Sequence, residues 1–306
     1  MKRKDFLLAL LVVMIWGANF TVIKLGLDGV PSMLLVAVRY AFVAFPAIFF
    51  VKKPNLEWKY IIFYGLTVGV GQFACLFYAL ETGMPAGLAS IIVQLQSFIS
   101  PFMGAIFLGE DLNSRQLIGF IIAGLGLSLI AIASTSNGVS AIPLGPLLLT
   151  VCAPIFWSIS NIIAKYCANK VASEGQQLDM LAMVVWSSLV PPIPMLLLAM
   201  LINTPQLLIS SLANLNFMSV FAALYVSLAA TLFGYGFWNN LISKYPLGII
   251  SPISLLVPIF GLLISKIVLM EQLSKFQWLG AIVILIGLLI ANIDMGQVLD
   301  KSKEPA

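Results

Sequence analysis

Long apolar stretches separated by short polar breaks dominate this sequence and leave very little charge to face water. Only 9% of the 306 residues are charged and 61% are hydrophobic, whereas a soluble domain carries about 25% charged residues. A membrane core takes about 20 apolar residues per helical span, so a chain of this length accommodates roughly ten spans. We therefore expect an all-α polytopic membrane protein whose outer surface faces lipid.

Polar breaks predict where the spans begin and end. Pro31, Pro85, Pro146 and Pro246 stand where helices would begin. Proline is tolerated there because the first N–H groups of a helix have no partner within it. The expected spans are residues 5–25, 32–51, 59–80, 86–108, 116–134, 146–167, 178–202, 217–241, 248–269 and 275–293.

The basic residues predict the orientation. With the N-terminus inside, most Lys and Arg residues fall in the cytoplasmic segments, whereas the polar loops at 134–145 and 203–216 contain none. Because basic loops stay in the cytoplasm, ten spans place both termini there. The apolar run after the basic start is long enough to span and shows no cleavage site, so we interpret it as a retained span.

An internal repeat divides the chain into two halves. Pro85–Leu127 aligns without a gap with Pro246–Leu288, and the identities include polar and glycine positions that apolar composition does not explain. Each copy has five spans, so the second copy is inverted, as is typical of secondary transporters with a site near the midplane. The predicted domains are residues 1–137 and 138–306. The informative pairs are Pro85/Pro246, Gly87/Gly248, Ser90/Ser251, Glu110/Glu271, Leu112/Leu273, Gln116/Gln277, Gly119/Gly280 and Gly126/Gly287.

Arg39 is a charged residue inside an expected span. A charge near the bilayer centre costs roughly 2.5–3.5 kcal/mol on insertion scales, so something must compensate it. One interpretation is that Arg39 meets the carboxylate of a solute or a gating acid. The other is a structural pair with Glu81, Asp28 or backbone carbonyls, and the sequence leaves both open.

Neutral polar side chains also occur within the spans. Amides both donate and accept hydrogen bonds, which suits a small polar or zwitterionic solute. Interhelical hydrogen bonds would use the same groups, but the set as a whole favours a water-filled cavity. The predicted binding residues are Asn19, Gln72, Gln94, Asn161, Tyr235 and Trp238, and Trp16, Trp157, Tyr78, Gln96 and Asn239 belong to the same set.

The carboxylates lie at span ends or in loops. A proton relay deep in the membrane therefore has no obvious carrier, with Glu81 as the one exception. We expect facilitated efflux or exchange, with proton coupling as the second option and with Arg39 and Glu81 as the candidate gating or charge-bearing residues. Glu110 and Glu271 follow the ends of spans 4 and 9, and we expect each to cap the next helix, that is, spans 5 and 10.

Several classes of function are excluded by what the sequence lacks. It contains no His, and its three Cys residues are isolated from one another. We therefore expect no metal site and interpret the thiols as packing residues. No phosphate-binding glycine loop follows a strand, and no nucleophile–base pair appears, so we expect neither a cofactor nor an enzyme. The basic residues are scattered, which predicts a lipid bilayer and no nucleic acid as partner. The oligomeric state is left open.

Three segments carry a family resemblance. They are WGANFTVIKLGL at Trp16–Leu27, VRYAFVAFPAIFF at Val38–Phe50 and the Gly-Glu-x-Leu signature at Gly109–Leu112. They resemble the EamA family of the drug/metabolite transporter superfamily, and the likeness covers essentially the whole chain. The second copy of the signature, Met270–Leu273, has Met in place of Gly. The resemblance implies ten helices in inverted five-helix repeats around a cavity lined by spans 1, 3, 4, 6, 8 and 9.

The resemblance also implies a function. Gly83–Phe98 and Ser254–Leu263 are most similar to bacterial inner-membrane exporters of cysteine and O-acetylserine. We therefore expect an inner-membrane secondary transporter that exports small amino-acid metabolites by alternating access. The alternatives are export of another solute, such as aromatic amino acids, nucleosides or drugs, and a passive channel or membrane scaffold.

Overall fold

The computed structural model describes residues 2–45, 47–109, 114–134, 142–234, 237, 238, 241, 253 and 256–292. Within these ranges the regular structure is helical and no strand occurs, which confirms the expected all-α class. Six helices are long and apolar enough to cross a membrane, or seven if a pair of helices bent by 91° is one span. The shorter apolar helices are Leu117–Ile130, Leu256–Val268 and Lys275–Ala291.

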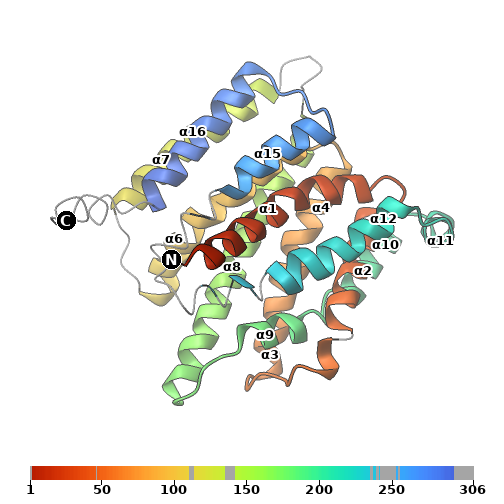
Figure 1. Ribbon diagram of the computed structural model, residues 1–306, viewed down its shortest axis with the longest axis vertical. Helices are drawn as coiled ribbons and strands as arrows, with labels where there is room; N and C mark the ends of the chain where they lie inside the picture. The colour runs from red at the N-terminus through yellow and green to blue at the C-terminus, as the bar shows by residue number, and fades with distance from the viewer. Residues whose placement is uncertain are drawn as a thin grey trace.

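Figure 1 shows the arrangement of the helices. Those of the N-terminal part are α1 (Arg3–Gly26), α2 (Ser32–Ala44), η1 (Ala47–Phe49), α3 (Trp58–Tyr64), η2 (Gly65–Gln72), α4 (Phe73–Glu81), α5 (Ala86–Ile92), η3 (Val93–Leu95), α6 (Gln96–Leu108) and α7 (Ser114–Ser134). Those of the C-terminal part are α8 (Leu144–Ser173), α9 (Met180–Ser187), α10 (Pro192–Ile202), α11 (Pro205–Ala213), α12 (Phe217–Leu224), η4 (Tyr225–Phe233), α15 (Leu256–Val268) and α16 (Lys275–Asn292).

One predicted span is interrupted, and one predicted loop contains a helix. The span expected at 178–202 agrees with a single apolar segment, Met180–Ile202, that is long enough to cross a membrane. Within it lie two helices, α9 and α10, with a break at residues 188–191. Pro191 and Pro192 explain the break, because proline has no N–H to continue the hydrogen bonds of the preceding helix. The loop expected at 203–216 contains α11, which begins at Pro205 and is capped by the Thr204 hydroxyl accepting from the N–H of Leu207. A threonine cap followed by proline is a strong start signal for a helix.

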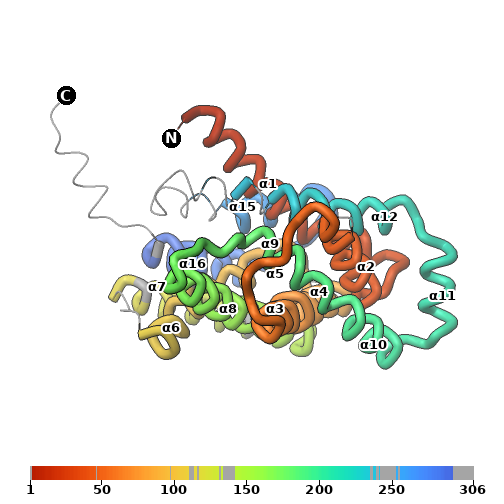
Figure 2. The backbone as a smooth tube through the Cα atoms, turned by 90° about the horizontal axis from the view of Figure 1, so that it is seen from below, coloured from red at the N-terminus to blue at the C-terminus, as the bar shows by residue number. Residues whose placement is uncertain are grey.

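The helices form two layers (Figure 2). In this view α1, α12 and α15 lie in one layer, and α3, α4, α6 and α8 lie in the other. The helices α7 and α16 pack against each other at one end of the molecule (Figure 1). The outer surface carries many exposed large apolar side chains, such as Phe49, Phe50 and Leu201. Apolar surface on this scale is typical of a protein that faces lipid.

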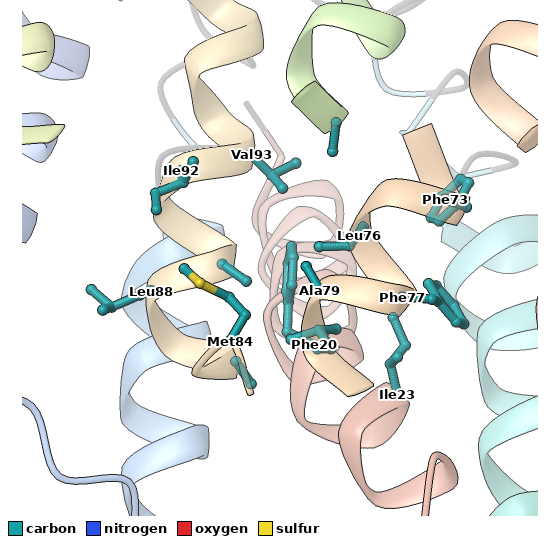
Figure 3. Close-up of a cluster of buried hydrophobic side chains, with 14 of the residues drawn as sticks. Phe20, Ile23, Phe73, Leu76, Phe77, Ala79, Met84, Leu88, Ile92 and Val93 are labelled. Atoms are coloured by element: carbon teal, nitrogen blue, oxygen red, sulfur yellow. The ribbon is translucent and has the colours of Figure 1, made fainter. Parts of the chain in front are cut away.

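The interior between α1, α4 and α5 is filled by apolar side chains (Figure 3). Phe20 of α1 and Leu76 of α4 lie on the side of Met84, which comes just before α5, whereas Phe77 points away on the other side of α4 and Ile92 lies farther along α5. All five residues are buried. Close packing of this kind is what holds helices together in lipid, where burial of apolar surface gives no advantage.

Glycines bring α7 and α16 into backbone contact. A Cβ atom on Gly119 would lie 2.5 Å from the carbonyl oxygen of Gly287, and a Cβ on Gly126 would lie 2.6 Å from that of Gly280. Gly119 aligns with Gly280 in the sequence repeat, and Gly126 aligns with Gly287. The contact is therefore reciprocal, because each position touches the repeat equivalent of the other. By contrast, a Cβ atom on Gly124, which has a small residue four positions later, would meet no atom of the described residues within 4 Å.

Candidate solute cavity

A cavity of about 330 Å³ lies between the helices of both parts of the chain. That volume is at the small end of the range for small-molecule sites. Its polar lining residues are Asn19, Arg39, Gln72, Gln94, Gln96 and Asn161. Its aromatic and aliphatic lining residues are Trp16, Phe20, Phe73, Leu76, Val93, Trp157, Ala230, Trp238 and Val257. None of the described lining residues is Asp or Glu.

The structure brings most of the predicted site residues together. The predicted site residues that line the cavity are Asn19, Arg39, Gln72, Gln94, Asn161 and Trp238. Tyr235 lies outside the described residues. Glu81 does not line the cavity and instead ends α4, where its carboxylate accepts from the N–H and the hydroxyl of Ser32 at the start of α2. The gating role of Glu81 stays a prediction.

A hydrogen-bonded group connects α6 and α8 at the cavity wall. The side-chain amide of Asn161 donates to Gln96 Oε1 at 3.1 Å and to Ser100 Oγ at 3.0 Å. Ser100 Oγ in turn lies 3.1 Å from Ser158 Oγ. Neither serine was predicted, although Ser158 lies three residues before Asn161 and therefore shares its helix face. These bonds hold the Asn161 amide in one orientation.

Arg39 reaches the cavity from α2. The residue is only 4% exposed, and its Nη2 donates to Thr231 Oγ1 of η4 at 3.1 Å. Its guanidinium carbon lies 4.0 Å from the centre of the Phe73 ring, a distance at which an aromatic face stabilises a cation. Thr231 was not predicted, because a hydroxyl in an apolar span gives little sequence signal.

Two acceptor oxygens in the cavity have no donor in the part of the chain that the structure describes. Asn19 is 9% exposed and Gln72 is 4% exposed. Asn19 Oδ1 and Gln72 Oε1 are buried without a hydrogen-bond partner among the described residues. More than 90% of such buried groups are hydrogen-bonded in native proteins, so an unpartnered oxygen in a cavity marks a place where a ligand donor fits.

Two π-helical segments border the cavity. The first, η2, ends at Gln72, and the second, η4, contains Ala230 and Thr231. The carbonyl oxygen of Ala230 accepts a hydrogen bond from the side chain of another helix, Trp16 Nε1, at 2.9 Å. Departures from α-helical winding of this kind are frequent at functional sites, and here both lie beside the cavity.

An aromatic wall completes the site. The rings of Trp16 and Trp238 lie 5.2 Å apart between centroids. Trp16 packs against Gly234, where a Cβ atom would lie 2.5 Å from Nε1. A side chain at Gly234 would therefore displace the indole that forms this wall.

Comparison with known proteins identifies the family. The sequence model of the EamA-like transporter family matches residues 4–132 and 144–293. The chain belongs to the EamA-like transporter family. Its EamA relatives include a probable amino-acid metabolite efflux pump of Escherichia coli strain K12, which is 40% identical over 290 residues, or 95% of each chain.

More distant similarities agree with this assignment. A probable terminal-alkyne amino-acid exporter of Streptantibioticus cattleyicolor is 21% identical over 290 residues, covering 92% of this chain and 91% of that protein. A solved crystal structure with 13% sequence identity matches 99% of this chain and 100% of its own chain with a TM-score of 0.59. That likeness shows a shared fold.

The EamA signature glutamate Glu271 joins the two parts of the chain. Its Oε1 accepts from the N–H of Ala86 at 2.6 Å and from Lys24 Nζ at 3.2 Å, and its Oε2 accepts from the N–H of Gly87 at 3.0 Å. The expectation that it caps the next helix, span 10, is wrong, because it caps α5. The repeat alignment gives no information on which helix lies opposite this carboxylate. Glu110 lies outside the described residues.

A second ionic group lies at the opposite end of the bundle (Figure 1). Lys170 at the end of α8 contacts the Glu57 carboxylate before α3 at 2.6 Å, and Lys59 contacts it at 2.7 Å. The hydrogen bond from Lys170, followed by that from Lys59, lowers the pKa of Glu57 to about 2. This EamA protein therefore has an ionic contact between its N- and C-terminal parts at each end.

Proposed function

We propose that this EamA protein is a secondary exporter of small amino-acid metabolites of the cysteine and O-acetylserine kind, and that it works by alternating access. The observation that carries the proposal is the cavity, where the described lining residues include amides from both parts of the chain and one arginine, and no acid. The 40% identity to a probable amino-acid metabolite efflux pump supports the substrate class.

The membrane arrangement is part of the proposal. We propose ten spans in two inverted halves, residues 1–137 and 138–306, in a bacterial inner membrane with both termini cytoplasmic. Six long apolar helices, one bent pair and three shorter apolar helices support the number of spans. The reciprocal glycine contact between α7 and α16 supports a two-fold relation between the halves. The basic residues support the orientation.

The predicted residues have separate roles in this proposal. Asn19, Gln72, Gln94, Asn161 and Tyr235 bind the polar groups of the solute, and Trp238 forms a wall against its apolar part. Arg39 and Glu81 set the charge and the opening of the pathway. The orientation of Asn161 by Gln96 and Ser100 supports a binding role, because a positioned amide binds without the cost of ordering it first.

Flux into proteoliposomes tests the function. Purified protein is reconstituted, and the initial rates of cysteine, O-acetylserine and threonine transport are measured against solute concentration. We expect saturable flux for at least one of the three. Asn161→Leu removes two hydrogen bonds at the cavity, and we expect the rate to fall at least tenfold.

The control is Asn214→Leu, because the Asn214 amide is exposed and bonds only to its own helix end among the described contacts. We expect this variant to transport at the wild-type rate. No saturable flux of any of the three amino acids by wild-type protein would overturn the proposal. Equal rates for Asn161→Leu and Asn214→Leu would remove Asn161 from the site.

A further inference from the structure

The cavity contains a cation and two open acceptors on different helices. Arg39 projects from α2, Asn19 lies on α1 and Gln72 ends η2. All three residues are at least nine-tenths buried. A guanidinium recognises carboxylates in a planar, two-pronged geometry. An amide oxygen accepts hydrogen bonds, and an ammonium group offers three donors and no acceptor.

Residues beside the cavity hold the Arg39 side chain in place. The Phe73 ring lies under the guanidinium, and the Thr231 hydroxyl accepts from one of its nitrogens. Thr231 is itself fixed, because its hydroxyl donates to the carbonyl oxygen of Val226 at 2.7 Å. A guanidinium positioned in this way presents its charge to the cavity without a search among rotamers.

The charge balance selects among solutes. The described lining residues include one cation and no acid. A cationic solute would add a second positive charge in a region of low dielectric, where like charges repel strongly. A solute that has only a carboxylate would leave Asn19 Oδ1 and Gln72 Oε1 without donors. A zwitterion brings a carboxylate to the guanidinium and a donor group to both oxygens.

We propose that the cavity recognises the free α-amino-acid headgroup, with the Arg39 guanidinium binding its carboxylate and with Asn19 Oδ1 and Gln72 Oε1 accepting hydrogen bonds from its ammonium group. This assignment rests on the proposed export function and adds a definite substrate class to it. The solute side chain then lies toward the Trp16 and Trp238 wall. Amines without a carboxylate, and acids without an ammonium group, are poor substrates.

A set of three related solutes tests the assignment. Cysteine, cysteinamide and N-acetylcysteine have the same thiol side chain, but the second lacks the carboxylate and the third lacks the ammonium group. Initial rates are measured in proteoliposomes under reducing conditions, with protein-free liposomes subtracted. We expect wild-type protein to transport cysteine at least tenfold faster than either derivative. If threonine is the faster amino acid in the flux screen, threoninamide and N-acetylthreonine replace the derivatives.

Variants separate the two halves of the headgroup. We expect Arg39→Gln to bring the ratio of cysteine to cysteinamide rates close to one. We expect Gln72→Leu and Asn19→Leu to bring the ratio of cysteine to N-acetylcysteine rates close to one. The matched control for the arginine is Arg115→Gln at the start of α7, outside the cavity lining, and both ratios should stay at their wild-type values.

The outcomes distinguish this assignment from the proposed function. Wild-type protein that transports none of the solutes overturns both. Wild-type protein that transports cysteine and cysteinamide equally well overturns the headgroup assignment and leaves export standing. If Arg39→Gln is folded by gel filtration and lowers all three rates in proportion, Arg39 is structural and the assignment is wrong. If that variant does not fold, the wild-type ratios and the two amide variants decide.

Discussion

Replacing Glu271 by alanine tests the link between the N- and C-terminal parts of the chain. The carboxylate accepts from the N–H groups of Ala86 and Gly87 and from the Lys24 ammonium group. Losing a helix cap costs about 0.5–2 kcal/mol. Removing one partner of a fully buried ion pair costs about 3–5 kcal/mol of stability. The cost is smaller for this pair, because the Lys24 side chain is 29% exposed to solvent. We expect a total loss of roughly 2–4 kcal/mol.

Thermal unfolding of the purified protein measures this loss. The six Trp residues provide an intrinsic fluorescence signal. Since 1 kcal/mol corresponds to roughly 2–4 °C for a domain of 150–250 residues, a loss of roughly 2–4 kcal/mol should lower the midpoint by on the order of 4–16 °C. Glu174→Ala is the control, because Glu174 is an exposed carboxylate after α8 and such sites contribute within about 0.5 kcal/mol. A midpoint for Glu271→Ala as high as that of the control would refute the reasoning.

Two further predictions concern packing and pH. Gly126→Val places a Cβ atom 2.6 Å from the carbonyl oxygen of Gly280. We therefore expect the variant to lower the free energy of unfolding by about 1–3 kcal/mol, measured by thermal unfolding. Gly124→Ala on the same helix is the control, because a Cβ there faces open space, and we expect it to leave the free energy of unfolding unchanged. The pKa of Glu57 is lowered to about 2 from 4.5, chiefly by Lys170, so its stabilising contribution is complete above pH 4.5 and is lost as the pH falls toward 2. The difference in melting temperature between wild type and Glu57→Gln should therefore shrink over that interval, and a constant difference would contradict it.

The membrane class and most of the cavity lining follow from the sequence, because lipid makes buried polar residues conspicuous. Asn19, Gln72 and Asn161 stand out against apolar neighbours, and each polar group in a span needs a reason to be there. Arg39 stands out as well, because it is a charged residue among apolar ones. The same logic does not find Thr231 or Ser158, since small hydroxyls bond to their own helix and are common in spans.

Other features depend on tertiary contacts that no local pattern records. The π-helical segments η2 and η4 begin at Gly65 and Tyr225, and neither residue type signals this winding in the sequence. The partner of Glu271 could not be deduced either, because α5 and Glu271 are far apart in the sequence. Gly119 and Gly126 of α7 appear in the sequence as identities of the internal repeat, but only the structure identifies α16 as the helix that they contact.

Counterflow of labelled cysteine in proteoliposomes tests the central claim most directly. Vesicles are loaded with unlabelled cysteine and diluted into a trace of labelled cysteine. A carrier whose single cavity opens to one side at a time predicts a transient accumulation of label above equilibrium, with Asn214→Leu behaving as wild type and Asn161→Leu showing a much smaller peak. Label that equilibrates without an overshoot, and at a rate independent of the cysteine loaded inside, would indicate a channel and contradict the account.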